Sequence, residues 1–135
     1  MVTKKAASFI DLLDIEIDDP NSEPSMTAIA TIKIDEHHGQ YYDVLHGGVL
    51  YSLADTLAGY LVWKNVSSTS LVTTIEMKIN YISAVPIKGS VKAQAEIKHL
   101  GRRTGVVNVD VLHVFGDKEK LVATALGTFQ IIDKS

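Results

Sequence analysis

The segment 46–63, HGGVLYSLADTLAGYLVW, is apolar around almost the whole circumference of the helix that it predicts. It opens on a glycine pair, Gly47 and Gly48, and it carries one carboxylate, Asp55, near its middle. A helix that is apolar on nearly every side has to be covered on more than one side. The pattern therefore predicts a central helix that contains a single carboxylate.

Downstream of this helix the hydrophobic pattern changes to a period of two, which is typical of strands with one buried face. Such strands are predicted over 71–82, 90–99, 107–115 and 121–131. In the first of them the residues predicted to face the helix are Thr73, Ile75, Met77, Ile79 and Tyr81. Turn sequences separate the strands, among them LGRRTG at 100–105.

Two further elements are predicted before the central helix: a short amphipathic helix over 5–13 and a strand over 26–34. The whole order indicates an α+β fold in a single domain over 1–135, with one long helix packed on a mostly antiparallel sheet. The sheet covers only one side of that helix, and the sequence offers no second helix of similar length. We therefore expect a second copy of the chain to cover the other side, which makes the protein a homodimer.

Composition and charge exclude several classes of function. Apolar residues make up 46% of the chain and charged residues 21%, and the formal net charge of −3 offers no field that would attract nucleic acid. The chain has no cysteine, which excludes disulfides and thiolate metal sites. The N-terminus, MVTKKAASF, has no apolar stretch of signal-peptide length behind its lysines, and no uncharged run is long enough to span a membrane, so we expect a cytoplasmic protein with no membrane partner.

Two adjacent histidines, His37 and His38, resemble a metal-binding pair only in their residue type. Adjacent side chains rarely point the same way, and no third ligand stands at a suitable spacing. We interpret the pair as part of a solvated loop and expect no metal.

Several motifs follow one another in a specific order. HGG at 46–48 precedes Asp55, and NYISAVPIKG, LGRRTG and ATALGTF follow downstream. With these motifs the chain, from about residue 40 to residue 131, resembles the hotdog-fold acyl-CoA thioesterases of the phenylacetic-acid-degradation type. The resemblance implies a hotdog fold, in which the sheet wraps the central helix. It also implies homodimers that can pair into homotetramers, and hydrolysis of an acyl- or aryl-CoA at the dimer interface without a cofactor.

Thioester hydrolysis needs hydrogen-bond donors for the oxygen that becomes negative, and a group that activates water or attacks the carbonyl. The first N–H groups of a helix have no partner within the helix, so those of Gly47 and Gly48 can hold an oxyanion, and glycine at these positions lets the substrate approach the backbone. Gly47 is the predicted oxyanion donor and Gly48 a predicted substrate-binding residue. Asp55 is the predicted general base or nucleophile. Gly47 and Asp55 stand about 12 Å apart along one helix, so we expect each site to combine Asp55 of one subunit with Gly47 of the other.

Other residues receive roles from the resemblance. Thr73 stands where the family carries a hydroxyl that holds the water or the acid, and Gln40 stands where many relatives carry an asparagine that polarises the thioester carbonyl. His46 orients the carbonyl-binding end of the site or simply caps the helix. Arg102 and Arg103 either meet the phosphates of coenzyme A or form a solvated turn.

Two alternatives remain open. The first is a non-catalytic protein that binds or senses acyl-CoA, with Asp55 as a structural carboxylate. The second is a hotdog acyl-thioester dehydratase, which needs a histidine paired with the acid, whereas His46 lies on another side of the helix from Asp55. Aspartate at position 55, where the dihydroxynaphthoyl-CoA branch of the family tends to have glutamate, favours the phenylacetyl type.

Overall fold

The computed structural model describes residues 8–19 and 23–134. Its elements in chain order are α1 (Ser8–Leu12), β1 (Glu16–Asp18), β2 (Thr27–Lys33), the short 3-10 helix η1 (Glu36–His38), α2 (Gly47–Trp63), β3 (Ser70–Tyr81), β4 (Ser90–Leu100), β5 (Thr104–Phe115) and β6 (Lys118–Asp133). The predicted central helix is confirmed, because α2 begins directly after His46 and ends at Trp63. Of the helix predicted over 5–13, α1 confirms the part within the described residues; residues 5–7 lie outside them.

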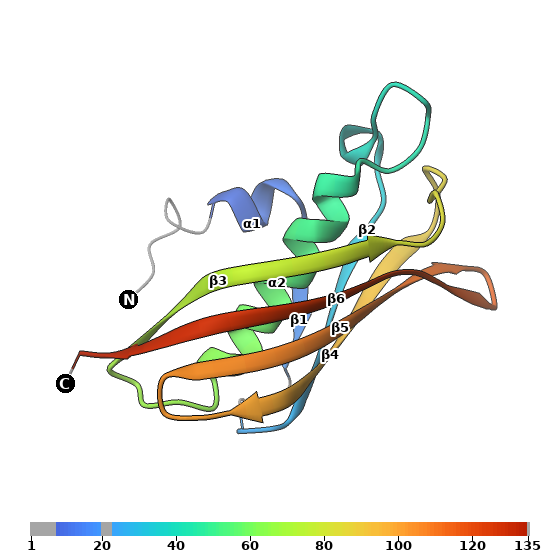
Figure 1. Cartoon of the computed structure of the whole chain (residues 1–135). Helices are drawn as coiled ribbons and strands as arrows, with labels where there is room; N and C mark the ends of the chain where they lie inside the picture. Colours follow the sequence, from blue (N-terminus) through green and yellow to red (C-terminus); the bar gives the residue numbers. More distant parts are fainter. Residues whose placement is uncertain (1–7, 20–22, 135) are drawn as a thin grey trace.

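The strands of the described segments form a six-stranded antiparallel sheet in the order β1-β2-β4-β5-β6-β3. Figure 1 shows α2 lying along one face of this twisted sheet, with α1 beside it. The helix contacts five of the strands, β2 to β6, so the sheet wraps around it. The predicted α+β architecture is confirmed. Within the described residues, no helix is both long and apolar enough to cross a membrane.

The core lies between α2 and the concave face of the sheet. On the helix it is formed by Val49, Leu50, Leu53, Ala54, Leu57, Ala58, Leu61 and Val62. On the central strands it is formed by alternate residues, Val91, Ala93, Ala95 and Ile97 of β4 and Val107, Val109 and Val111 of β5. The alanines of the sheet let the helix approach closely, and the alternation explains why the period-two pattern identified these strands.

One side of α2 and one edge of the sheet remain uncovered. The side of the helix that runs beside the edge strand β3 carries Tyr51, Asp55 and Trp63, which are all at least partly exposed. The edge strand β3 pairs only with β6 among the described strands, although it is long and carries the exposed apolar side chains Leu71 and Ile75. Long apolar edge strands usually have a covering partner.

A β-bulge in β3 changes which residues of the strand face α2. Before the bulge, Thr74 pairs with the buried Phe129, so both side chains lie on the helix-facing side. The register shifts between Thr74 and Glu76, which leaves Ile75 as the extra residue. After the bulge, the buried Met77 lies on the helix-facing side. Even-numbered residues therefore face the helix before the bulge, and odd-numbered residues face it afterwards.

This bulge corrects two sequence predictions. Thr73 pairs with the exposed Gln130 on the outer face, and Ile75 is 57% exposed, so the prediction that both face the helix is wrong. The prediction is confirmed for Met77 and Ile79, which belong to the core or pack against it. The physical reason is that one inserted residue moves every side chain on one side of the insertion to the opposite face.

The interpretation of His37 and His38 as a solvated pair is also wrong for one of them. His37 is exposed, but His38 is completely buried, and both rings turn toward Asp14 at the end of α1. The 3-10 turn of η1 brings the adjacent rings within 4.0 Å of each other, centroid to centroid.

Candidate functional site

His46 forms the N-cap of α2. Its backbone is extended, its carbonyl accepts from the Val49 N–H, and its Nδ1 accepts a hydrogen bond of 2.8 Å from the Gly48 N–H. These bonds satisfy backbone donors that have no partner within the helix. Because Nδ1 is an acceptor here, the proton of a neutral His46 ring stands on Nε2. The structure therefore gives His46 the capping role that the sequence left open.

Gly47 offers the available backbone donor at this end of α2. The Gly48 N–H is bound to His46, whereas no acceptor for the Gly47 N–H is found in the described parts of the chain. On its other side, the Gly47 carbonyl accepts a hydrogen bond of 2.8 Å from the Tyr81 hydroxyl. A Cβ at position 47 would stand 3.2 Å from the Tyr81 ring, so glycine allows this close contact. Gly47 combines a fixed position with a free N–H at the positive end of the helix dipole.

Asp55 lies two turns further along α2, on the side that faces β3. The Thr74 hydroxyl donates a hydrogen bond of 2.7 Å to Asp55 Oδ1. Thr74 reaches the carboxylate only because the bulge turns it toward the helix. The sequence prediction placed a hydroxyl at this point but named Thr73, which points away. No signal in the sequence separates the two, because both positions are threonine.

A groove of about 560 Å³ opens beside the Asp55 carboxylate. It is lined by Ile10, Ile17, Asp55, Thr56, Gly59, Tyr60, Trp63, Ser70, Leu71, Val72, Thr74 and Phe129. Asp55 is the charged member of this lining, and most of the remaining wall is apolar or aromatic. Gly59 stands one helical turn beyond Asp55 and faces Phe129, so the absence of a side chain there leaves space next to the carboxylate. Such a groove suits an apolar group attached to a reactive centre.

A second cavity, of about 260 Å³, lies at the start of α2. Gln40, Gly47 and Tyr81 are among the residues that line it. The structure therefore brings together Gln40 and Gly47, which the sequence assigned to the carbonyl-binding end. Asp55 lines the other groove, and eight residues of helix, about 12 Å, separate it from Gly47. Within one chain, the acid and the predicted oxyanion donor are in different places.

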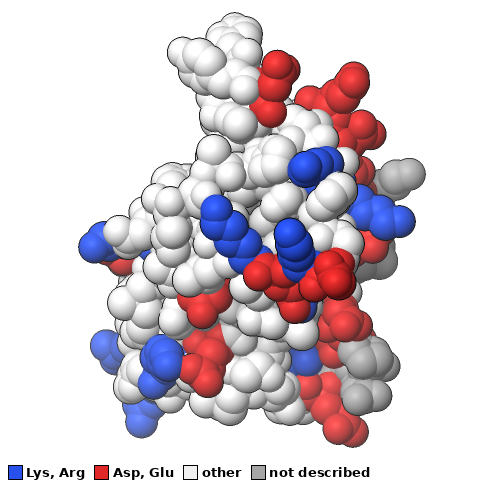
Figure 2. Space-filling view, turned by 90° about the vertical axis from the view of Figure 1, so that its right-hand side faces the viewer, with Lys and Arg blue, Asp and Glu red and all other residues white. Residues whose placement is uncertain are grey.

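Arg102 and Arg103 lie in the exposed hairpin between β4 and β5, and neither lines either of these two cavities. The Arg103 carbonyl accepts from the Ile131 N–H, which places the hairpin at the end of the sheet far from Gly47. Figure 2 shows one face of the molecule on which basic side chains lie among acidic ones. That face has no continuous basic surface of the kind that binds nucleic acid.

The fold and the sequence motifs together define a family. The model of the thioesterase superfamily matches residues 42–118, which is more than half of the chain, and the chain belongs to this superfamily. Its sheet wrapped around one long helix is the hotdog fold. Membership makes the protein a thioester hydrolase by class.

Similar proteins carry related names. The chain is 29% identical over 128 residues to "Putative esterase ComA2" of Bacillus subtilis, covering 94% of this chain and 96% of that protein. It is 27% identical over 107 residues to the 1,4-dihydroxy-2-naphthoyl-CoA hydrolase of Listeria monocytogenes, covering 79% and 84%. Among solved structures, the thioesterase HI1161 of Haemophilus influenzae has a TM-score of 0.83 at 26% identity, covering 96% of this chain and 87% of that one.

Proposed function

We propose that this protein hydrolyses an acyl- or aryl-CoA thioester to the free acid and coenzyme A. The observation that carries the proposal is the Asp55 carboxylate, held at 2.7 Å by Thr74 and placed at the wall of an apolar groove. A carboxylate in this position can act on a thioester carbonyl while the groove receives the acyl group. The Listeria relative named as a naphthoyl-CoA hydrolase supports a coenzyme A ester as the substrate.

In this proposal Asp55 acts as general base or as nucleophile, and the free Gly47 N–H stabilises the oxyanion. Because about 12 Å separates the two along one helix, each site takes Asp55 from one subunit and Gly47 from the other. A homodimer with its α2 helices antiparallel meets this requirement. The exposed side of α2 and the unpaired edge of β3 support such a dimer, since both are surfaces that a second copy would cover.

The remaining site residues keep supporting roles. Gln40 shares the cavity of Gly47 and would contact the thioester carbonyl. The hydroxyl role that the resemblance gave to Thr73 belongs to Thr74. Arg102 and Arg103 would meet the phosphates of coenzyme A from the exposed hairpin. The aspartate at position 55 favours the phenylacetyl type within the family.

The test is release of free coenzyme A from aryl, short-chain and long-chain acyl-CoAs by the wild type and by Asp55→Asn. The chain offers a matched control in Asp110, whose carboxylate also accepts a 2.7 Å hydrogen bond from a threonine, Thr124, but on the outer face of the sheet. We expect Asp55→Asn to lose turnover and Asp110→Asn to keep it, with both variants folded by circular dichroism. No turnover of any substrate by the wild type would favour the non-catalytic acyl-CoA-binding protein.

A further inference from the structure

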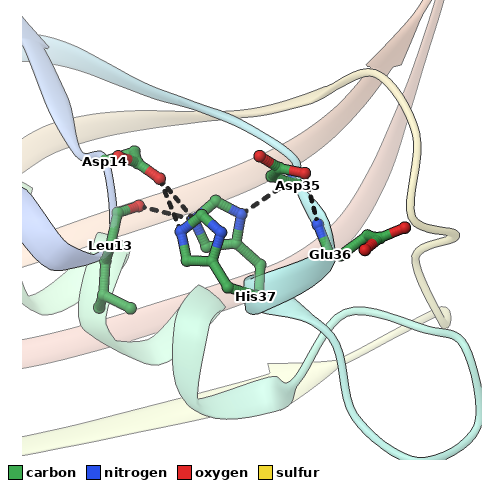
Figure 3. Close-up of polar contacts among 6 residues, drawn as sticks. Leu13, Asp14, Asp35, Glu36 and His37 are labelled. Atoms are coloured by element: carbon green, nitrogen blue, oxygen red, sulfur yellow. Dashed lines mark hydrogen bonds and ion pairs between the residues drawn. The ribbon is translucent and has the colours of Figure 1, made fainter.

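A buried histidine joins the N-terminal helix to the loop that leads into α2. His38 Nε2 donates to the Leu13 carbonyl at 3.0 Å and lies 3.2 Å from Asp14 Oδ2, both at the end of α1. Its Nδ1 accepts a hydrogen bond of 2.9 Å from the Asp35 N–H. Figure 3 shows these contacts together with the exposed His37, whose Nε2 lies 2.8 Å from the same Asp14 oxygen.

The three side chains Asp14, His37 and His38 stand close enough to be considered as a metal site. The hydrogen bonds of His38 argue against one. A histidine that binds a metal through one nitrogen normally carries a proton on the other and donates it. Here Nδ1 faces the Asp35 N–H, which is itself a donor, so a proton on Nδ1 would place two donors against each other. These bonds fix the tautomer of His38, with its proton on Nε2, from which it is donated to the Leu13 carbonyl.

The main chain of His38 makes a second connection. Its carbonyl accepts a hydrogen bond of 2.9 Å from the N–H of His46, the N-cap of α2. The side chain of this one residue therefore holds the end of α1, while its backbone holds the start of α2. Because His38 is completely buried and bonded at both ring nitrogens, its position is closely fixed.

The helix that His38 holds is part of the wall of the groove beside Asp55. Ile10 of α1 lines that groove, together with Ile17 of β1. A helix of five residues has too little internal hydrogen bonding to keep its place alone, so α1 depends on its anchors. In the described residues its anchors are the packing of Ile10 and Leu13 against the core, the buried Ile15 that follows it, and the polar contacts of the two histidine rings, of which the bond from the buried His38 to Leu13 is shielded from water.

We propose that His38 is a positioning residue that holds α1 as a wall of the acyl groove and so sets which acyl groups the site accepts. This inference rests on the proposed hydrolysis at Asp55. Because Ile10 and Asp55 line the same groove, we expect long or broad acyl groups to gain more apolar contact from this wall than an acetyl group, which has one methyl to bury. Loss of the hydrogen bond from His38 to Leu13 therefore changes the selectivity between substrates and leaves the chemistry at the thioester carbonyl unchanged.

Two substitutions separate the functions of the His38 ring. His38→Gln keeps an amide donor near the position of Nε2 and loses the acceptor for Asp35. His38→Asn keeps an acceptor near Nδ1 and loses the donor to Leu13. The quantity to measure is the selectivity ratio, kcat/KM for aryl or long-chain acyl-CoAs divided by kcat/KM for acetyl-CoA. We expect His38→Asn to lower this ratio about tenfold and His38→Gln to stay near the wild-type ratio.

Controls connect the effect to α1. Ile10→Ala removes the wall directly and should shift the ratio in the same direction, and adding His38→Asn to it should produce little further shift. His37→Asn removes the exposed contact to the same Asp14 oxygen and should leave the ratio unchanged. An equal loss for every substrate in His38→Asn, or an unchanged ratio, would overturn the proposal.

Two measurements do not depend on turnover. The first is the affinity for non-hydrolysable thioether analogues of the same acyl-CoAs, which should show the same change of selectivity in His38→Asn. Because binding needs no turnover, this result tests the role of His38 even if the proposed hydrolysis is wrong. In the wild type, nitrogen NMR should find the His38 proton on Nε2 and protected from exchange. A proton on Nδ1 would contradict the hydrogen bond from His38 Nε2 to Leu13, and this measurement needs no variant protein.

Discussion

The Thr74 hydroxyl donates a 2.7 Å hydrogen bond to the Asp55 carboxylate, and a β-bulge one residue further along β3 makes this contact possible. The bond engages Oδ1 and restricts the orientation of a carboxylate that belongs to the lining of the groove. A hydrogen bond to a charged group contributes about 1.5–3 kcal/mol. Asp55 is therefore oriented by a residue that the alternation of the strand assigned to the wrong face.

Replacing the threonine by its isostere tests that orientation. We expect Thr74→Val to lower kcat about tenfold to a hundredfold, since that range corresponds to the loss of one hydrogen bond to a charge. Coenzyme A release measures the effect. Thr73→Val is the neighbouring control, because Thr73 points away from the helix. A larger loss in Thr73→Val than in Thr74→Val would mean that the bulge lies elsewhere in solution.

The composite site makes a prediction about mixed dimers. Gly47→Pro removes the free N–H at a helix position where proline is tolerated, and Gly47→Ala keeps the N–H while adding the same contact near Tyr81. We expect Gly47→Pro and Asp55→Asn each to be inactive alone. After unfolding and refolding as an equal mixture, they should recover about a quarter of wild-type activity, because half of the dimers are mixed and each has one intact site. No recovery, with mixed dimers detected by mass spectrometry, would place the whole site within one subunit.

The capping role of His46 predicts an effect on stability. His46→Ala should lower the free energy of unfolding by about 1 kcal/mol, measured by urea denaturation, because the Gly48 N–H loses its acceptor. Asparagine is a good N-cap residue, so His46→Asn should restore the stability and retain turnover. A stable but inactive His46→Asn would instead give the imidazole a chemical role.

Tyr81 predicts a dependence of stability on alkaline pH. Partial burial, followed by the nearby Tyr51, raises the pKa of the half-exposed Tyr81 phenol above its ordinary value. The folded state therefore binds this proton more tightly than the unfolded state, and the resulting stability is complete below about pH 10 and declines as pH rises through the raised pKa. The decline in unfolding free energy should be less steep in Tyr81→Phe. Tyr42→Phe, in an exposed loop, should show the wild-type slope.

A largely buried ion pair lies at the C-terminal end of α2. Lys64 Nζ lies 3.0 Å from Asp19 Oδ1, and the two side chains are only 8% and 14% exposed. Lys64→Met should lower the free energy of unfolding by about 1.5–3 kcal/mol, because the largely buried Asp19 carboxylate loses its hydrogen bond from the Lys64 ammonium. Lys98→Met breaks the exposed pair with Glu96 and should change stability by less than about 1 kcal/mol. Equal effects in urea denaturation would show that the Lys64 pair is solvated.

The sequence by itself determined the central helix, its start at the glycine pair and the order of the long strands. Hydrophobic periodicity reports which face of an element is buried, and both the all-round apolar helix and the alternating strands express it directly. The distance between Gly47 and Asp55 also follows from the sequence, because helical rise per residue is fixed.

The tertiary structure alone decided which threonine meets Asp55 and what surrounds His38. An inserted residue in a strand leaves the local composition unchanged, so only the pairing of β3 with β6 reveals that Thr74 has replaced Thr73 on the helix side. The ring of His38 meets the turn that follows α1, which comes from a distant part of the chain and supplies the Leu13 carbonyl. Periodicity describes neighbours along the chain, whereas register and contacts between distant segments are set by the packing of the whole fold.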